Sequence, residues 1–432
     1  MTAYRANTSY RWSAVAIVGV LLATACTSAA PAATGGSTSA TTAPAAATTA
    51  PQPAAAGGGD IVIGASLPLS GPLAPFGANI QMGYQRAVDN VNKAGGLDVG
   101  GTKHQVSLVV LDDQSDPNMA TDQARTLYQR NNAVALLGAA TPPLNIPISQ
   151  VADQVKRPAV IGACPIRAWL SGKPDGWQYA WDIFFDENQM TDLQFQTADL
   201  VQTNKKVALF TDTEEDGVTM GDLWEQKAPT LGYQVAYHAK FPVGTNNFSS
   251  QIDAAKSASA QVLIAQMVPP DAFALWKQMK ALSYQPVVAY CEKCGNSGAW
   301  HQVLGDVGEG TNAADWWSSS LGYPESQDFV NAYAQQLGGQ STDLSGIVSS
   351  YAAAQVLLDA ITKAGSTSPE AINAALATTD KTYAVGPVKF GADHTSALKA
   401  IMDQWQGPNM VRVYPTGSGS TALKAPVPGL GQ

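Results

Sequence analysis

Cysteines separated by two residues are the most distinctive chemical feature of this chain. Cys291 and Cys294 enclose Glu292 in the run YCEKCGN, and Cys164 lies far upstream. In an oxidising compartment, Cys291 and Cys294 would form a short-range disulfide that stiffens the loop around Glu292 and leaves Cys164 free. A bridge from Cys164 to one of the other two is the alternative.

The same cysteines suggest metal or redox chemistry as further alternatives. Zinc would need His301 and Cys164 beside the closely spaced pair, whereas structural zinc usually has two such ligand pairs and this chain offers one. A thioredoxin-like motif begins a helix in a small domain, whereas CEKC stands in a late loop. We therefore expect neither a metal nor a cofactor.

Catalysis would need a nucleophile beside a general base. The histidines, at His104, His238, His301 and His394, fall outside the loops expected to form a cleft. The sequence also has no Gly-Xaa-Ser-Xaa-Gly motif, phosphate loop or two-histidine zinc motif. These observations predict that the protein is not an enzyme.

The elements that position these residues are strands that alternate with helices. Apolar strands precede segments with helical spacing, as in DIVIGASL before ANIQMGYQRAVDNVN, VSLVVLDD before MATDQARTLYQR, and KVALFTD before MGDLWEQKAPTLG. Such alternation predicts parallel sheets with right-handed crossovers. Ligands of open α/β sheets bind at the carboxyl ends of the strands, so we expect function in SLPLSGPLAPFG, LGAATPPLNIP, IGACPIRAW, TDTEEDG, AQMVPPD and YCEKCGN.

Length and charge narrow the class of protein. The 432 residues, 45% of them hydrophobic, suffice for two α/β domains with sizeable cores. A formal net charge of -9, with no basic run, makes nucleic acid a poor partner. The long apolar run from Ala14 to Ala23 is shorter than the roughly 20 residues that a helix needs to span a bilayer.

The N-terminal segment has the composition of an export signal followed by a tether. Arg5 and Arg11 precede the apolar run, and small residues lead to Cys26, which is the layout of a secretory signal over residues 1–25. LLATAC resembles a bacterial lipobox, so we expect lipidation of Cys26 and anchoring to the outer face of the cytoplasmic membrane. Residues 26–59 are almost wholly Ala, Thr, Ser, Pro and Gly and are predicted to form a flexible tether.

From Asp60 to about Pro415, the order of motifs resembles the type I periplasmic binding proteins, specifically the branched-chain amino-acid-binding family that serves ABC importers. The motifs include GASLPLSGPLAPFG, VNKAGGLDVGG, LDDQSDP, GTNNFSSQI, LGDVGEGT, and GPVKF followed by QWQG. The resemblance implies an α/β fold of two Rossmann-like lobes joined by three crossover strands, with the ligand in the cleft between them. It places lobe one at residues 60–182 plus 318–391 and lobe two at residues 183–317 plus 392–432.

The resemblance also implies which residues line the cleft. An aromatic pocket residue falls on Phe76, and the carboxylate that faces a ligand ammonium group falls on Glu292, which would otherwise be a solvated loop charge. In lobe two, Asp216 and Met267 stand in loops where the family has tyrosines, although Asp216 would equally suit a solvated position. We take Trp317 as the cleft member of a tryptophan pair whose rings should face opposite sides.

The two loops that bind a carboxylate in the family depart from its pattern. The first reads Ala140, Thr141 and Pro142, so that Thr141 keeps a hydroxyl while Pro142 replaces a serine. The second offers Cys164 as a weak donor and Pro165 where a free amide would help. The expected ligand is a small organic solute: an amino acid, an amide, or another uncharged or cationic molecule with an apolar or aromatic body.

Together, these features predict an extracytoplasmic solute-binding receptor that works by hinge closure. Its expected partners are a small-molecule ligand, the permease subunits of an ABC transporter and the membrane, and it is expected to be a monomer. A ligand-sensing subunit of a signalling complex with the same bilobed fold is the alternative.

Overall fold

The computed structural model describes residues 61–333 and 344–431. The predicted signal peptide, the tether and Cys26 lie outside the described residues. The first of two large sheets is parallel, with strand order β4-β1-β5-β6-β7. Its strands are β1 (Ile61–Leu67), β4 (Val106–Asp112), β5 (Ala135–Leu137), β6 (Ala159–Ile161) and β7 (Ala180–Asp182).

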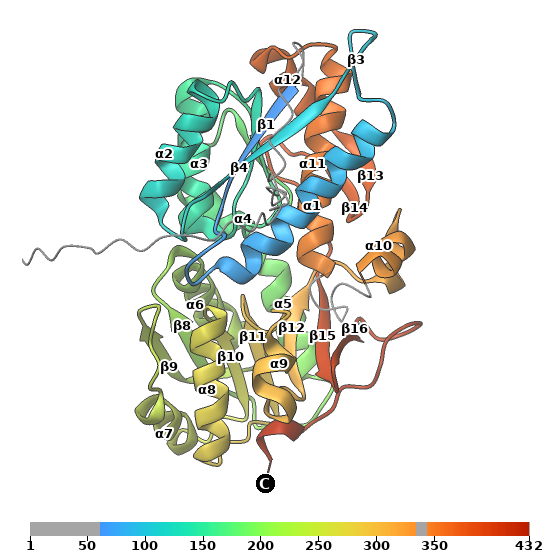
Figure 1. The fold of residues 1–432 in the computed structure, drawn as a ribbon. Coiled ribbons are helices and arrows are strands. Elements are labelled where there is room, and N and C mark those ends of the chain that lie inside the picture. Colours follow the sequence, from blue (N-terminus) through green and yellow to red (C-terminus); the bar gives the residue numbers. More distant parts are fainter. Residues whose placement is uncertain (1–60, 334–343, 432) are drawn as a thin grey trace, which may run out of the picture. The chain divides into compact units, whose positions relative to one another are not determined.

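Helices cover both faces of this first sheet. Figure 1 shows α2 (Pro117–Gln129) and α3 (Thr141–Val155) on one face, and α1 (Ala74–Lys93) and α11 (Leu344–Ala364) on the other. The remaining elements of this lobe are the helices α4 (Ile166–Ser171), α10 (Ser326–Tyr333) and α12 (Pro369–Leu376), and the hairpins β2 (Leu97–Val99) with β3 (Thr102–His104) and β13 (Asp380–Tyr383) with β14 (Gly386–Lys389).

The second large sheet has seven strands in the order β16-β15-β12-β11-β10-β8-β9. The strands are β8 (Lys206–Asp212), β9 (Gln234–Phe241), β10 (Val262–Gln266), β11 (Val288–Glu292), β12 (Thr311–Asp315), β15 (Ile401–Gln406) and β16 (Asn409–Tyr414). The pairings from β9 to β12 are parallel, and β15 and β16 add antiparallel pairings. The helices of this lobe are α5 (Glu187–Ala198), α6 (Glu215–Lys227), α7 (Ser249–Ser257), α8 (Pro269–Ala281) and α9 (Trp300–Leu304).

The chain crosses between the two sheets three times, after β7, after β12 and before β15. The first and third crossings run side by side through the bridges Asp182 to Thr395 and Phe185 to Leu398. The predicted fold class is thereby confirmed. Since these crossings fall near the expected boundaries, we retain 60–182 plus 318–391 and 183–317 plus 392–432 as proposed lobe limits.

Local sequence explains where several helices begin. Asp116 accepts hydrogen bonds from the amides of Asn118 and Met119 and so caps α2, and Asp186 caps α5 in the same way. Prolines occupy the first turn of α2, α3 and α8, where an amide hydrogen is not needed. The helices α3 and α6 begin at Thr141 and Glu215, inside segments expected to be loops.

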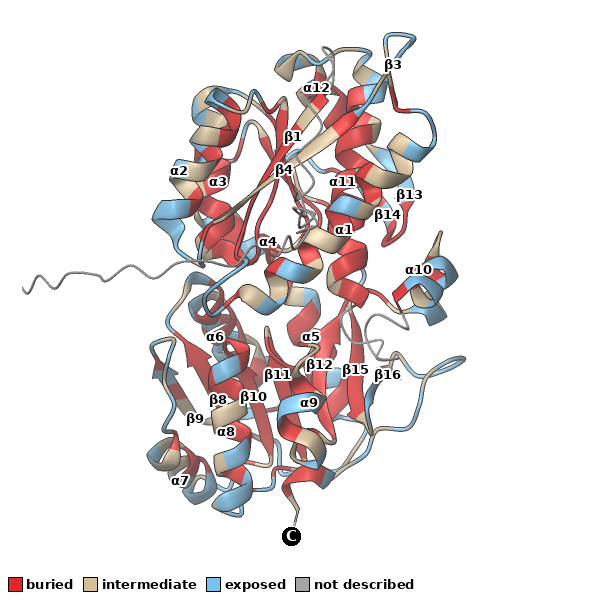
Figure 2. Cartoon of the chain, in the orientation of Figure 1, coloured by how far each residue is buried: buried red, intermediate tan, exposed pale blue. Residues whose placement is uncertain are grey.

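The helix α11 is the most buried helix of lobe one. Within the described residues, it alone is long and apolar enough to pass for a membrane span, but 83% of its apolar window is buried inside the fold. Figure 2 shows buried residues along α11 and along the strands of both sheets. Burial of this kind is what a core helix needs, so we assign α11 to the lobe-one core.

Close packing of α1 against α11 depends on Gly83. A Cβ atom at this position would lie 2.3 Å from the carbonyl oxygen of Ile347 and 2.8 Å from the amide nitrogen of Tyr351. Both atoms belong to the backbone of α11, so a side chain at Gly83 would push the helices apart.

We therefore expect Gly83→Ala to lower the free energy of unfolding by about 1–3 kcal/mol, the usual cost of overpacking. Gly346→Ala on α11 is the matched control, because its Cβ would meet nothing closer than the Cβ of Asn79 at 3.9 Å. The control should be neutral or slightly stabilising, since alanine favours helix. Urea denaturation of both variants decides, and equal stabilities would contradict the packing argument.

Candidate ligand-binding site

A cavity of about 490 Å³ lies between the two lobes. Its described lining comes from the start of α1, the segments after β5 and β6, the starts of α3, α6 and α11, the helix α5, the ends of β10, β11 and β12, the crossings after β7 and β12, and the segment that leads into and includes part of α9. The residues are Pro75, Phe76, Ala78, Asn79, Ile80, Ala140, Thr141, Ala163, Pro165, Phe184, Phe185, Met190, Asp216, Gln266, Glu292, Lys293, Asn296, Ser297, Gly298, Ala299, Gln302, Ala314, Trp316, Ser345, Gly346 and Ser349. Since both lobes contribute, a ligand here would touch both.

The crossing segments form an aromatic wall. The ring centroids of Phe184 and Trp316 are 4.2 Å apart, and Phe185 lies 4.7 Å from Phe184 and 5.5 Å from Trp316. The indole nitrogen of Trp316 donates to the main-chain oxygen of Ser345 at 3.3 Å, which ties the second crossing to α11. This wall suits an apolar or aromatic ligand body.

Glu292 presents a buried carboxyl group to the cavity. Only 2% of the residue is exposed. The side-chain amide of Gln194 donates to its Oε1 at 2.6 Å, and the amide of Ala314 donates to both oxygens, at 3.3 and 3.2 Å. Burial raises the pKa of Glu292 to about 7, against the lowering effect of these hydrogen bonds. The group is therefore poised between its neutral and charged forms near neutral pH.

Beside Glu292, the ammonium group of Lys293 is held by three carboxylates. Its Nζ contacts Glu214, lies 3.2 Å from Asp216 and lies 3.5 Å from Asp212. Burial by itself would lower the pKa of Lys293, but the carboxylates raise it above its ordinary value. The Lys293 side chain is only 5% exposed, so this cation is already neutralised before any ligand arrives.

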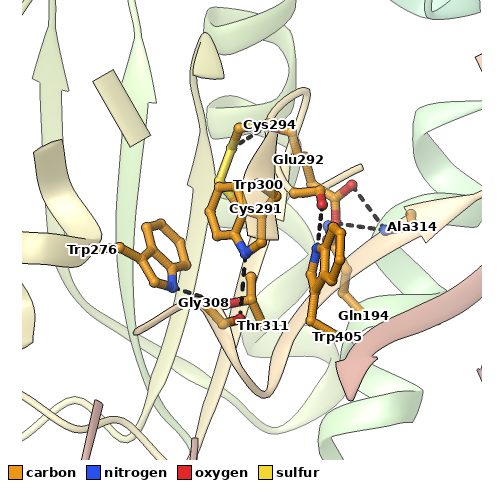
Figure 3. The surroundings of a disulfide bond; sticks show 11 residues. Gln194, Trp276, Cys291, Glu292, Cys294, Trp300, Gly308, Thr311, Ala314 and Trp405 are labelled. Carbon is orange, nitrogen blue, oxygen red and sulfur yellow. Dashed lines mark hydrogen bonds between the residues drawn. A yellow bond between two sulfur atoms is a disulfide. The ribbon is translucent and has the colours of Figure 1, made fainter. Parts of the chain in front are cut away.

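A disulfide fixes the loop that carries these two residues. Cys291 and Cys294 are bonded, with Cα atoms 5.4 Å apart, and Lys293 between them has a left-handed backbone with φ of 65°. Figure 3 shows the disulfide against a group of tryptophans, of which Trp405 donates to the main-chain oxygen of Gly295 at 2.6 Å. Because both sulfurs are bonded to each other, they are not available as zinc ligands, and Cys164 is free and buried.

Thr141 brings an unpartnered hydroxyl to the lobe-one side of the cavity. Its Oγ1 is buried and has no hydrogen-bond partner among the described residues. The residue also has a positive φ of 62°, which is strained for a β-branched side chain. Strain and an orphaned polar atom at a cavity are both typical of a position kept for binding.

Six of the residues predicted for the site line the cavity, and they come from both lobes. They are Phe76, Ala140, Thr141, Pro165, Asp216 and Glu292. Asp216 is not a free acceptor, because it pairs with Lys293 and also accepts a hydrogen bond from Gln266 at 2.9 Å. The roles of these residues in binding remain proposals.

Four predicted residues do not line the cavity. The prediction that Trp317 faces the cavity is wrong. Trp316 lines the cavity instead, because adjacent side chains of an extended segment face opposite sides. For the same reason Met267 packs in the lobe-two core while the preceding Gln266 faces the cavity. Cys164 is buried in a cluster with Trp169 and Trp177, and Pro142 is buried in the first turn of α3.

Several lining residues were not predicted from the sequence. Phe184 and Phe185 follow β7 directly, so their place at the carboxyl end of a strand was a usable signal. Lys293 carried no comparable signal, because its three partners lie about 80 residues earlier in the chain, at sequence separations of 77 to 81.

Two α/β lobes with a shared cavity define a bilobed receptor for a small ligand. Residues 60–407 match the family described as "Periplasmic binding protein", so the chain belongs to this family. The family comprises exported solute-binding receptors and is not a family of enzymes.

Curated relatives and solved structures agree with this assignment. The Leu/Ile/Val-binding protein homolog 7 of Brucella abortus is 26% identical over 385 residues, covering 85% of this chain and 94% of the relative. Leucine-binding protein LivK of Thermotoga maritima has a TM-score of 0.71 at 22% identity, covering 82% of this chain and 97% of its own. The R. palustris solute-binding protein in complex with benzoate has a TM-score of 0.71 at 20% identity, covering 82% and 96%. The two structures show a shared fold.

The buried carboxyl groups predict how stability depends on pH. Burial raises the pKa of Glu187, Glu292 and Asp315 to about 7. Their contribution is complete below the unfolded pKa of about 4 and is lost as the pH rises through about 7, since folding favours the protonated form. The ligand-free protein should therefore lose stability between about pH 5 and about pH 8, by up to roughly 1.4 kcal/mol per carboxyl group for each pH unit between its unfolded and folded pKa.

Urea midpoints across this pH range measure the effect. Asp315→Asn is the comparison variant, because it removes one titrating carboxyl group. Its amide oxygen can still accept hydrogen bonds from the amides of Trp316 and Trp317, which lie at 2.7 and 3.3 Å in the native protein. This variant should show a shallower pH dependence. A wild-type protein more stable at the alkaline end would contradict the prediction.

Proposed function

We propose that this protein is the solute-binding receptor of an ABC importer, and that it captures a small organic solute by closing its two lobes. The observation that carries the proposal is the cavity lined from both lobes and from two of the three crossings. A ligand that contacts both lobes stabilises the closed form by its differential affinity for that form. Several similar solved proteins are described as ABC transporter components, which supports permease subunits as the partner.

The cavity favours a cationic or uncharged ligand with an apolar or aromatic body. Among the described lining residues the cation is Lys293, and three carboxylates already engage it. A ligand carboxylate would therefore find no unpaired positive charge, and the prolines after Thr141 remove amide donors from the first turn of α3. Glu292 provides acceptor oxygens next to the aromatic wall, where a cation would also face ring surfaces.

The location follows from the family and from the N-terminal sequence. We propose that Cys26 carries the lipid, that residues 26–59 tether the two lobes outside the cytoplasmic membrane, and that the receptor is a monomer. Membrane fractionation of cells expressing Cys26→Ala would test the anchor, because the unlipidated variant should appear in the soluble fraction.

Three probes of nearly equal shape test the proposed ligand class. Benzamidinium, benzamide and benzoate share one aromatic ring and differ in charge. We expect benzamidinium to give the largest thermal shift of the purified protein and benzoate the smallest; a saturating ligand at about 100 times its Kd adds about 2.7 kcal/mol. Leucine serves as a further comparison. If benzoate or leucine gives a larger thermal shift than benzamidinium and benzamide, the proposed ligand class is overturned.

The Thr141 hydroxyl should matter for binding and not for folding. Thr141→Val keeps the β-branched shape and removes an atom that has no partner in the described structure. Stability without ligand should be unchanged or higher, because a buried unsatisfied hydroxyl is lost. The Kd of the best probe should rise roughly ten-fold, as expected for one lost hydrogen bond of about 1.4 kcal/mol. Calorimetry would measure the stability without ligand and the Kd of the best probe. An unchanged Kd would remove Thr141 from the site.

A further inference from the structure

Gln194 does not line the cavity, but it contacts Glu292, which does. Gln194 is fully buried on α5, and its side-chain amide donates to Oε1 of Glu292 at 2.6 Å. On its other side, the indole nitrogen of Trp224 on α6 donates to Oε1 of Gln194 at 2.6 Å. The three side chains form a buried hydrogen-bonded series from α6 through α5 to the end of β11.

The direction of this series follows from the chemistry of tryptophan. An indole nitrogen can only donate, so the oxygen of the Gln194 amide must face Trp224 and its NH₂ group must face Glu292. An NH₂ group can only donate in turn, so Oε1 of Glu292 must accept. The Ala314 amide donates to both oxygens of the same carboxyl group. Every hydrogen bond to the carboxyl group of Glu292 in the described structure therefore favours the ionised form.

Opposing influences come from burial and from neighbouring charges. On β12, Asp315 follows Ala314 and disfavours a second negative charge nearby. On β10, Gln266 is paired in register with Glu292 and is uncharged, and it binds Asp216 of α6. Lys293 is already held by Asp212, Glu214 and Asp216, and on β11 the hydroxyl of Tyr290 donates to the main-chain oxygen of Gln194 at 2.7 Å. No cation in the described structure pairs with Glu292, so the charge of this group depends on amide donors.

We propose that Gln194, oriented by Trp224, is a positioning residue that favours the ionised form of Glu292 and thereby makes the receptor selective for ligands with a positive charge. Gln194 does not touch the ligand in this proposal. It acts through Glu292, by partly offsetting the effect of burial, which favours the neutral form of this carboxyl group. The affinity part of this inference rests on the proposed function, whereas the titration part does not.

The first experiment titrates Glu292 in the protein without ligand. Carbon-13 NMR of glutamate-labelled protein gives the pKa of Glu292, with the Glu292→Gln spectrum to assign the signal. Gln194→Met removes the donor at similar volume and should raise this pKa by roughly one to two pH units, because a hydrogen bond to a charged group is lost. An unchanged pKa in this variant would overturn the proposal.

Two further variants separate this role from a merely structural one. Tyr290→Phe removes another buried hydrogen bond to Gln194, at its main-chain oxygen, and should leave the pKa of Glu292 unchanged. The double variant Gln194→Met with Trp224→Phe leaves no orphaned indole donor, so it keeps the test available if Gln194→Met alone folds poorly. The double variant should raise the pKa of Glu292 as much as Gln194→Met does, and a shift no larger than that of Tyr290→Phe would count against the proposal.

The second experiment measures affinity for benzamidinium and benzamide across pH by calorimetry. At about pH 7, Gln194→Met should bind benzamidinium roughly five- to fifty-fold more weakly than wild type and should recover at high pH, while benzamide should change little. A loss that is equal for both probes and independent of pH would mean a structural defect and would overturn the proposal. If wild type binds none of the probes, the proposed ligand class fails, and the titration still decides the role of Gln194.

Discussion

Burial of carboxyl groups at the junction of two lobes is the constraint on which the site depends. A charged carboxylate removed from water needs a cation or several hydrogen-bond donors, and otherwise it takes up a proton. Glu292 has donors and no cation in the described structure, and its pKa is raised to about 7. Asp212, Glu214 and Asp216 have a cation, Lys293. Adjacent lining residues therefore show two ways of burying a carboxyl group: Glu292 has hydrogen-bond donors, whereas the carboxyl groups around Lys293 have a cation.

Both carboxyl environments include a residue of the loop between β11 and α9, which a disulfide closes. Glu292 and Lys293 are adjacent, yet they serve different partners, α5 and β12 for one and the start of α6 for the other. Lys293 has a left-handed backbone within this loop, and the disulfide between Cys291 and Cys294 closes it. The tryptophans next to the disulfide pack in the lobe-two core, so the loop is joined to that core.

The crossing segments combine two functions. Phe184, Phe185 and Trp316 lie on the chain that joins the lobes, and the same rings line the cavity. In the proposed hinge closure, a ligand that packs against these rings acts directly on the segments that join the lobes. Ala314, whose amide binds Glu292, precedes the second crossing by a few residues, so the charged wall and the crossing are also adjacent in sequence.

The sequence by itself determined the α/β class, the alternation of strands and helices, and the loops in which the site would be found, because these depend on local periodicity and on the geometry of parallel sheets. The resemblance to a known family predicted Phe76, Thr141 and Glu292 as cleft residues, and all three line the cavity. Only the tertiary structure decided that Trp316 rather than Trp317 faces the cavity, since a one-residue shift reverses the side of an extended chain. Only the tertiary structure shows that Gln194 binds Glu292, 98 residues away in the sequence. The partners of a buried polar group depend on packing between elements and not on neighbours in sequence.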